Sequence, residues 1–325
     1  MKRIYYLVIG VVFLLFSSCG DGSQSGSSYK ILPSTSGKPG ELLVVLKDEY
    51  WNGVVGDSIR KIFKQPQYGL PQPEPIFTLS HVSPKGFASV LTRHRNLLIL
   101  KEGDKGVYQT TNEWSKPQVV VTLVGKNTYD FLSHLRERKH DLILHYNKVE
   151  RNRLIKAIGK NMDLEVVDEL KTKFHLSMVI PKSFYLAKAV DDFFWIRNET
   201  ADISQSIMVY FSEGRTTQMD SILAIRDSVS KSHITSETEG AYMQSERMYP
   251  PFSRPIKIKS KDVIETRGLW RMAGDFMGGP FLNYCFYDVK NNRTIFMDGF
   301  VYAPKLTKRE YLRQLEAILW SLEVI

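Results

Sequence analysis

Two patterns of apolar and polar residues follow one another along this chain. Residues 41–46 form a short apolar run typical of a buried strand, and the apolar positions of residues 55–63 then recur at the spacing of a helix. The first half is predicted to continue with strands at 76–82, 97–101 and 119–124, a short helix at 86–91, and a long helix or helix pair at 127–158. Strands alternating with helices indicate a small α/β layer with some parallel pairing.

From Lys173 onward the pattern is dominated by strands. They are predicted at 174–181, 183–190, 192–199, 204–213, 263–272, 281–289 and 294–302. Thr217 with Asp220 and Thr307 with Glu310 have the spacing of helix caps, so one helix should follow the fourth strand and another should close the chain. The polar stretch 232–261 indicates a lid, a hairpin insertion or a mobile segment. The predicted fold class is α+β, an N-terminal α/β layer followed by an antiparallel sheet flanked by helices.

The N-terminus has the pattern of an export signal. Lys2 and Arg3 precede an apolar run at 4–16 that is too short to span a bilayer, and two serines lead into Cys19. We expect cleavage before Cys19 and acylation of that cysteine, with palmitate among the chains. Phe16 departs from the leucine preferred at its position, so an ordinary secretory signal or an uncleaved anchor stays open.

The predicted domain organisation follows from these segments. The segments are a signal peptide at 1–18, a flexible tether at 19–40, an α/β domain at 41–160 and an α+β domain at 174–325. Residues 20–28 are rich in glycine and serine and cannot bury a core. We therefore expect an exported body that a lipid anchors to a membrane of the cell envelope, the outer membrane in particular. Exposure of this body to the periplasm is consistent with that expectation.

Charge and cysteine content limit the candidate chemistry. Loss of Lys2 and Arg3 lowers the formal charge from +9 to +7, which admits acidic envelope polymers or a protein as partners, whereas export argues against nucleic acid. Only Cys285 remains as a free thiol, and its apolar surroundings indicate a buried, inert side chain. Lys257, Lys259 and Lys261 alternate, as on one face of a strand that protects a sheet edge.

Few residue patterns point to a binding site or to catalysis. Asp275, Gly278 and Gly279 lie in a glycine-rich segment that could admit a ligand or simply form a turn. Trp51 could stack on a sugar or peptide, or cover the core. Asp191, Asp192, Asp275 and Asp298 form the pool of acids for hydrolysis, although no spacing selects a pair. The histidine spacing and the absence of HExxH and CxxC motifs lead us to expect no metal, and no cofactor motif is present.

Several segments carry resemblances to known families. The C-terminal half resembles the PsbP-like architecture at 179–184, 281–304 and 305–322, as a pattern only. The whole chain resembles a family of uncharacterised lipoproteins of the Bacteroidota, registered as a domain of unknown function. The segments concerned are FSSC, GELLVVLKDEYWNG, NLLILKEG, WSKPQVVV, GDFMGGPFLNY and DGFVYAP. This resemblance implies an envelope lipoprotein and supplies no catalytic residues.

The sequence therefore predicts a lipid-anchored envelope protein with a non-catalytic binding or assembly role. A carboxylate-dependent hydrolase of cell-wall or glycan material is the alternative, so enzymatic activity stays an open question. A cleft with two acids would favour the alternative.

Overall fold

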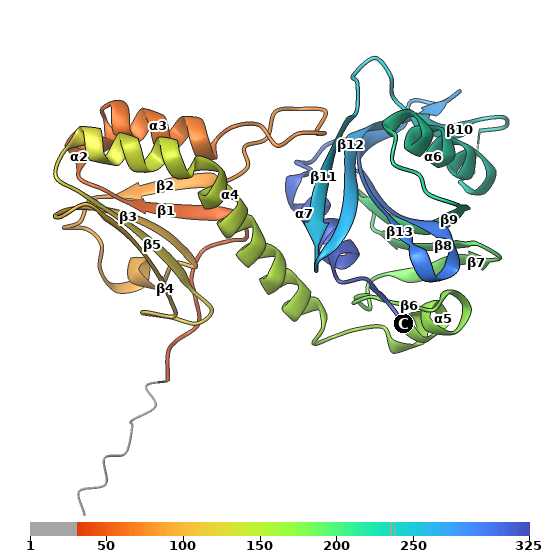
Figure 1. Ribbon diagram of the computed structural model, residues 1–325, viewed down its shortest axis with the longest axis horizontal. Coiled ribbons are helices and arrows are strands. Elements are labelled where there is room, and N and C mark those ends of the chain that lie inside the picture. Colours follow the sequence, from red (N-terminus) through yellow and green to blue (C-terminus); the bar gives the residue numbers. More distant parts are fainter. Residues whose placement is uncertain (1–30, 235, 237) are drawn as a thin grey trace, which may run out of the picture. The chain divides into compact units, whose positions relative to one another are not determined.

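A computed structural model describes residues 31–325 apart from 235 and 237. The signal segment and Cys19 lie outside the described residues. Residues 33–325 form one compact unit that contains two large sheets, one mostly parallel and one antiparallel. Helices accompany both sheets, which confirms the α+β class (Figure 1). No helix in the described part of the chain is both long and apolar enough to cross a bilayer.

The first sheet has the strand order β2-β1-β3-β5-β4. Its strands are β1 (Glu41–Val45), β2 (Thr78–Val82), β3 (Asn96–Glu102), β4 (Gly106–Thr111) and β5 (Val119–Gly125). The pairs β1–β2, β1–β3 and β3–β5 are parallel, as the alternating pattern predicts, and β4 pairs antiparallel with β5. Because parallel strands are buried on both faces, their sequences read as continuous apolar runs.

Three helices accompany this sheet. They are α2 (Asp48–Trp51), α3 (Val54–Phe63) and α4 (Thr128–Ile158). Leu42, Val44, Ile59 and Phe131 belong to the larger of the two cores on this sheet, which also takes in residues of α3 and α4. The opposite face carries a smaller core beside the 3₁₀ helix η2 (Ser89–Arg93), which overlaps the short helix predicted at 86–91.

The second sheet is antiparallel and has eight strands, in the order β10-β12-β13-β14-β9-β8-β7 with β11 also paired to β12. Its strands are β7 (Tyr185–Val190), β8 (Phe193–Glu199), β9 (Ser204–Glu213), β10 (Tyr242–Ser245), β11 (Phe252–Ile258), β12 (Lys261–Ala273), β13 (Gly278–Asp288) and β14 (Arg293–Tyr302). The predicted polar segment 232–261 therefore contains two further strands, β10 and β11. The short 3₁₀ turn η3 (Val289–Asn291) joins β13 to β14.

Both faces of this sheet are covered. One face packs with α5 (Leu164–Phe174) and α7 (Arg309–Trp320), while α6 (Met219–His233) covers the other. Alternate residues of β14 divide accordingly: Ile295 and Met297 lie in the first core, and Phe296 lies in the second. A sheet buried on both sides needs apolar residues at nearly every position, which explains the mainly apolar sequences of β13 and β14, interrupted by the paired polar residues Asn283 and Asp298.

Several local predictions were wrong for identifiable reasons. Residues 174–181 were predicted as a strand, but Phe174 ends α5, and only β6 (Leu176–Ser177) is extended, paired with β15 (Glu323–Val324). The N-cap of α6 is Gln218 and makes no side-chain cap bond, so Thr217 does not cap that helix. Lys259 and Ser260 form the turn between β11 and β12, so the three alternating lysines do not share one strand face.

Candidate functional site

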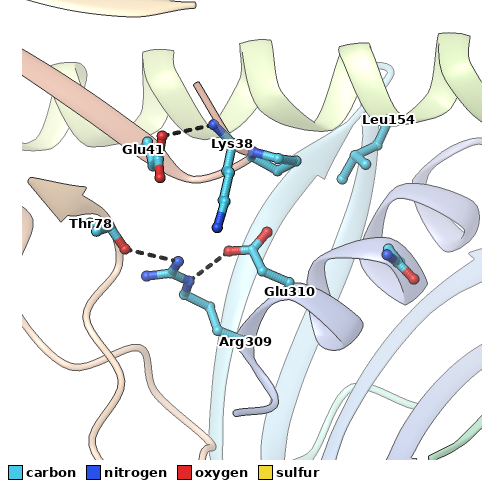
Figure 2. A pocket seen from close by; sticks show the side chains of 8 residues that line it. Lys38, Glu41, Thr78, Leu154, Arg309 and Glu310 are labelled. Atoms are coloured by element: carbon cyan, nitrogen blue, oxygen red, sulfur yellow. Dashed lines mark hydrogen bonds and ion pairs between the residues drawn. The ribbon is translucent and has the colours of Figure 1, made fainter. Parts of the chain in front are cut away.

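A pocket of about 460 Å³ lies where the beginning of the first sheet meets the N-terminal end of α7 (Figure 2). Its lining combines the segment before β1, the first residue of β2, the second half of α4 and the first turns of α7. The lining residues are Lys38, Pro39, Glu41, Thr78, Leu154, Arg309, Glu310 and Gln314. The pocket brings charges of both signs together from segments about 270 positions apart in the sequence.

A glycine allows the chain to pass this close to α7. Gly40 has a φ of +72°, and a Cβ there would lie 2.6 Å from Arg313 Nη1 and 2.7 Å from Glu310 Oε1. The left-handed conformation favours glycine at this position, and any larger residue would also have to displace the ends of these two side chains. The Gly40 N–H donates to Glu150 Oε2 at 3.1 Å, which fixes the turn against α4.

Glu150 is the buried acid beneath this turn. Its carboxylate accepts hydrogen bonds from Arg95, from Asn96 and from Arg153, at 3.0, 2.9 and 2.5 Å. Burial acts to raise the pKa of Glu150, but these cations and donors, with the Gly40 N–H, bring the pKa below its ordinary value. The acid is therefore ionised and serves as an anchor between β3 and α4.

The N-terminus of α7 is capped by a residue from the first half of the chain. Glu74 Oε1 accepts from the Lys308 N–H at 2.7 Å, and Glu74 Oε2 accepts from the Arg309 N–H at 2.9 Å. A carboxylate at this end of a helix satisfies free N–H groups and favours the helix dipole. The predicted capping box is wrong here, because Thr307 makes no cap bond and Glu310 pairs with Arg309 instead.

Arg309 is held in place on the pocket wall. Its guanidinium donates to Glu310 Oε1 at 2.7 Å, to the Pro75 carbonyl at 2.7 Å and to Thr78 Oγ1 at 3.2 Å. Figure 2 shows two of these contacts as dashed lines. Because its guanidinium already has these three partners, Arg309 shapes the pocket wall and adds a positive charge there, but it is not a free hydrogen-bond donor for a ligand.

Lys38 differs from the other cation of the pocket. Its backbone N–H donates to Glu41 Oε2 at 2.7 Å, while its side chain extends into the pocket (Figure 2). Across the described residues, no hydrogen bond or ion pair engages the Lys38 ammonium. The pocket therefore presents one available ammonium together with the carboxylates of Glu41 and Glu310.

Trp51 lies elsewhere and is engaged by neighbours. It ends α2 and is partly buried, and its ring stacks on His81 with centroids 4.5 Å apart at an angle of 4°. The Arg60 guanidinium lies 4.6 Å from the centroid of the same ring. These contacts agree with the alternative that Trp51 covers the core, and they leave less ring surface for a sugar.

Asp275, Gly278 and Gly279 come together in the hairpin between β12 and β13. Asp275 Oδ2 accepts from Ser236 Oγ and Thr238 Oγ1 at 3.2 and 3.3 Å. A Cβ on Gly279 would lie 2.0 Å from the Val301 carbonyl oxygen. This glycine therefore serves close approach between strands, and none of the three residues lines the pocket at α7.

The remaining nominated acids are also apart from the pocket. Asp298 is fully buried and accepts from Arg226 Nε at 2.8 Å, an ion pair inside the core beneath α6. Asp191 and Asp192 occupy the tight turn between β7 and β8, where Asp191 has a φ of +42°.

Burial raises the pKa of the Cys285 thiol to about 12, which fits an unreactive side chain. Over residues 31–325, apart from the two gaps, no group of three His, Cys, Asp or Glu side chains is placed to hold a metal.

Sequence reasoning missed the pocket because its parts carry no local motif. Lys38 and Glu41 belong to a turn-rich leader and a strand start, and Arg309 and Glu310 belong to a helix start. Each spacing is ordinary by itself. Long-range contacts such as those of Glu74 with the start of α7 and of Arg309 with Pro75 bring them together, and no sequence pattern predicts these contacts.

Comparison with known proteins finds one matching family model in each half of the chain, and both models describe domains of unknown function. Residues 35–159 match the family described as "Domain of unknown function (DUF8532)", and residues 163–321 match "Domain of unknown function (DUF4837)". No curated protein matches the chain.

Several solved structures show weak similarity, of which two are described. The Ran-binding protein Mog1p of Saccharomyces cerevisiae is 10% identical, with 46% of this chain and 90% of that chain covered and a TM-score of 0.31. Human StAR-related lipid transfer protein 5 is 8% identical, with 53% and 97% covered and a TM-score of 0.24. At these TM-scores neither similarity carries an argument about function.

Proposed function

We propose that this chain is a lipid-anchored protein of the cell envelope, exported from the cytoplasm, with a non-catalytic binding role. The address rests on the charged start, the short apolar run and Cys19, as in the Bacteroidota lipoproteins that the chain resembles. The binding role rests on the pocket at the N-terminal end of α7.

The single observation that carries the binding role is the mixed charge of this pocket. One unengaged ammonium, that of Lys38, stands beside the carboxylates of Glu41 and Glu310. Arg309 neutralises Glu310, and Lys38 and Glu41 carry opposite charges, so the lining has no net positive charge to attract an acidic polymer. A segment of an envelope protein that carries charges of both signs fits the lining better.

Affinity isolation from detergent-solubilised envelope tests the binding role. The full chain is compared with Lys38→Glu and with Lys85→Glu, a matched control that changes an exposed lysine outside the pocket lining. We expect at least one envelope protein to be depleted about tenfold with Lys38→Glu alone, the loss expected when a charged hydrogen bond is replaced by repulsion. Recovery of the same proteins with both variants would contradict the proposal.

The anchor is tested separately. We expect Cys19→Ala to move the protein out of the membrane fraction, because the acyl chains supply about 0.8 kcal/mol per buried methylene. Intact mass of the membrane-extracted wild-type protein should show the added lipid. A Cys19→Ala variant that stays as firmly bound would exclude lipidation as the anchor.

The alternative, a carboxylate-dependent hydrolase, is favoured by one observation: Glu41 and Glu310 line the same pocket. Two acids facing one cavity are the minimum arrangement for glycoside hydrolysis. Purified cell-wall and glycan material, incubated with the full chain, provides the test. If the wild-type chain releases fragments and each of the variants Glu41→Gln and Glu310→Gln abolishes that release, the hydrolase function replaces the binding role.

A further inference from the structure

A second cavity lies at the opposite end of α7 and has a different character. Its volume is about 290 Å³, near the lower end of the roughly 300–1,000 Å³ typical of small-molecule sites. It opens beside the hairpin of β11 and β12 and reaches between the sheet and the last turn of α7. Its apolar wall includes Ile258, Val263, Phe286, Met297, Leu319 and Leu322.

These wall residues belong to the main core of the antiparallel sheet. Each of them is buried, with exposed fractions between 1% and 7%. Apolar surface that stays accessible through a cavity is stabilised when an apolar group displaces water from it. The wall therefore favours a hydrocarbon chain over a polar ligand.

The rim of the cavity carries two lysines, Lys259 and Lys261, and one carboxylate, Glu323. Lys259 donates to Glu323 Oε1 at 2.7 Å and reaches the Ser321 carbonyl at 3.4 Å, so its charge is engaged at the end of α7. Lys261 lies with its ammonium 4.6 Å from the centroid of the Phe286 ring. No carboxylate pairs with Lys261 among the described residues.

The register of the hairpin explains why Lys261 is on the rim. Ile258 pairs with Lys261, so their side chains share the face that lines the cavity, whereas Lys257 pairs with Asp262 on the opposite face. Lys257 also forms an ion pair with Asp262 at 2.5 Å. The two lysines thus have the same charge and nearly the same place, but only Lys261 faces the cavity.

From this geometry we infer that the cavity binds a medium-chain fatty acid, with the hydrocarbon chain against the core wall and the carboxylate at Lys261. A single free ammonium beside an apolar cavity is complementary to a monoanionic amphiphile. The modest volume selects a medium chain. This site is independent of the pocket at the other end of α7 and of the partner proposed for it.

Photolabelling of the full chain tests the inference. The probe is a medium-chain fatty acid with a photoreactive group near its methyl end, added to the protein in detergent, and labelled peptides are identified by mass spectrometry. We expect label on peptides that carry Met297 or Leu319. Unlabelled fatty acids should compete with the probe, and their apparent affinity should rise about fourfold for each added methylene until the cavity is full. Label elsewhere, or competition that ignores chain length, would overturn the inference.

Variants of the hairpin provide the matched comparison. Lys261→Glu should weaken labelling about tenfold, because it replaces a charged contact with a repulsive one, while Lys257→Glu should leave it unchanged. Val263→Phe should block labelling by filling the cavity, and thermal unfolding checks that it folds. Equal labelling of the two lysine variants refutes the assigned carboxylate position. Competition by a lysophospholipid but not by a free fatty acid refutes the assigned ligand.

Discussion

The buried ion pair of Arg226 and Asp298 allows a quantitative test of what holds the antiparallel sheet together. Both side chains are fully buried. Arg226 donates from Nε to Asp298 Oδ2 at 2.8 Å and from Nη2 to Oδ1 at 3.3 Å, and Asn283 donates to the same carboxylate at 3.1 Å. The perturbation is Asp298→Asn, which keeps the shape and one acceptor but removes the charge.

The expected cost follows from what the substitution leaves behind. The Arg226 guanidinium would stay buried with two neutral acceptors, the amide oxygen of the substituted side chain and Ser245 Oγ at 3.3 Å, and with the Asp227 carboxylate no closer than 3.9 Å. Removing one member of a buried ion pair costs about 3–5 kcal/mol, a large share of the 5–15 kcal/mol by which proteins are usually stable. Removing both charges with Arg226→Met and Asp298→Asn leaves no isolated charge. The double variant should lie within about 2 kcal/mol of the wild type.

The sign of the pH dependence distinguishes the two single variants. Burial raises the pKa of Asp298, and Arg226 counteracts that effect. In Arg226→Met the counteracting charge is gone, so the folded-state pKa of Asp298 rises further above its unfolded value. The free-energy cost of burying the charged carboxylate is then complete above the folded-state pKa. It decreases as the pH falls from that value toward the unfolded-state pKa. The deficit of Arg226→Met should therefore shrink on acidification, whereas that of Asp298→Asn should not shrink in this way.

Thermal and urea unfolding of the full chain, followed by tryptophan fluorescence, measures these effects. Trp270 lies in the same core and reports on its loss. A loss of 3–5 kcal/mol corresponds to a Tm decrease on the order of 10 °C for a chain of this size. If Asp298→Asn costs less than about 1 kcal/mol, or the double variant costs the sum of the singles, the pair does not act as described.

Three further predictions concern single contacts. Glu74→Ala should destabilise the protein by about 2 kcal/mol through loss of the α7 cap, whereas the exposed control Glu213→Ala should cost less than about 0.5 kcal/mol in urea unfolding; equal losses would contradict the capping role. Burial lowers the pKa of His94, so protonation favours the unfolded chain and stability should fall as the pH drops below 6.5. The Tm of His94→Gln should depend less on pH over that range, and an unchanged dependence of Tm on pH would exclude His94 as a contributor. Gly279→Ala should cost more than about 2 kcal/mol, because its Cβ meets the rigid Val301 carbonyl; a wild-type Tm would show that the strands can separate there.

Much of the fold could be predicted because its strands are buried on both faces. The predicted strands 281–289 and 294–302 correspond to β13 at Gly278–Asp288 and β14 at Arg293–Tyr302, where mainly apolar runs leave little ambiguity. β4 was missed because Gly106–Thr111 is a largely exposed edge strand with no apolar alternation. Helix α5 was missed because its Asp163 cap follows closely on the long basic helix.

The pocket could not be predicted, for a different reason. A local motif reports on residues within one or two turns, whereas Glu74 and the α7 N-terminus are separated by more than 230 positions. The nominated acid Asp298 was chosen by residue type, and only its burial and its contact with Arg226 show its structural role. Residue types therefore indicated which chemistry was possible, but only the tertiary contacts show which charged side chains are already paired and which face a pocket.

Helix α7 explains why two dissimilar cavities occur in one compact unit. Its twelve residues span about 18 Å, and each part of the helix is held by a charge from another element. Glu74 caps its start, Glu316 in its middle accepts from Arg151 of α4 at 2.9 Å and from Arg267 of β12 at 3.0 Å, and Lys259 meets its end. A shift of the helix would leave the largely buried charges of Glu74 and Glu316 unpaired, a cost that displacing apolar contacts alone does not carry. A helix held in this way cannot move to fill the space at either end, so a polar pocket persists at its start and an apolar cavity persists at its end.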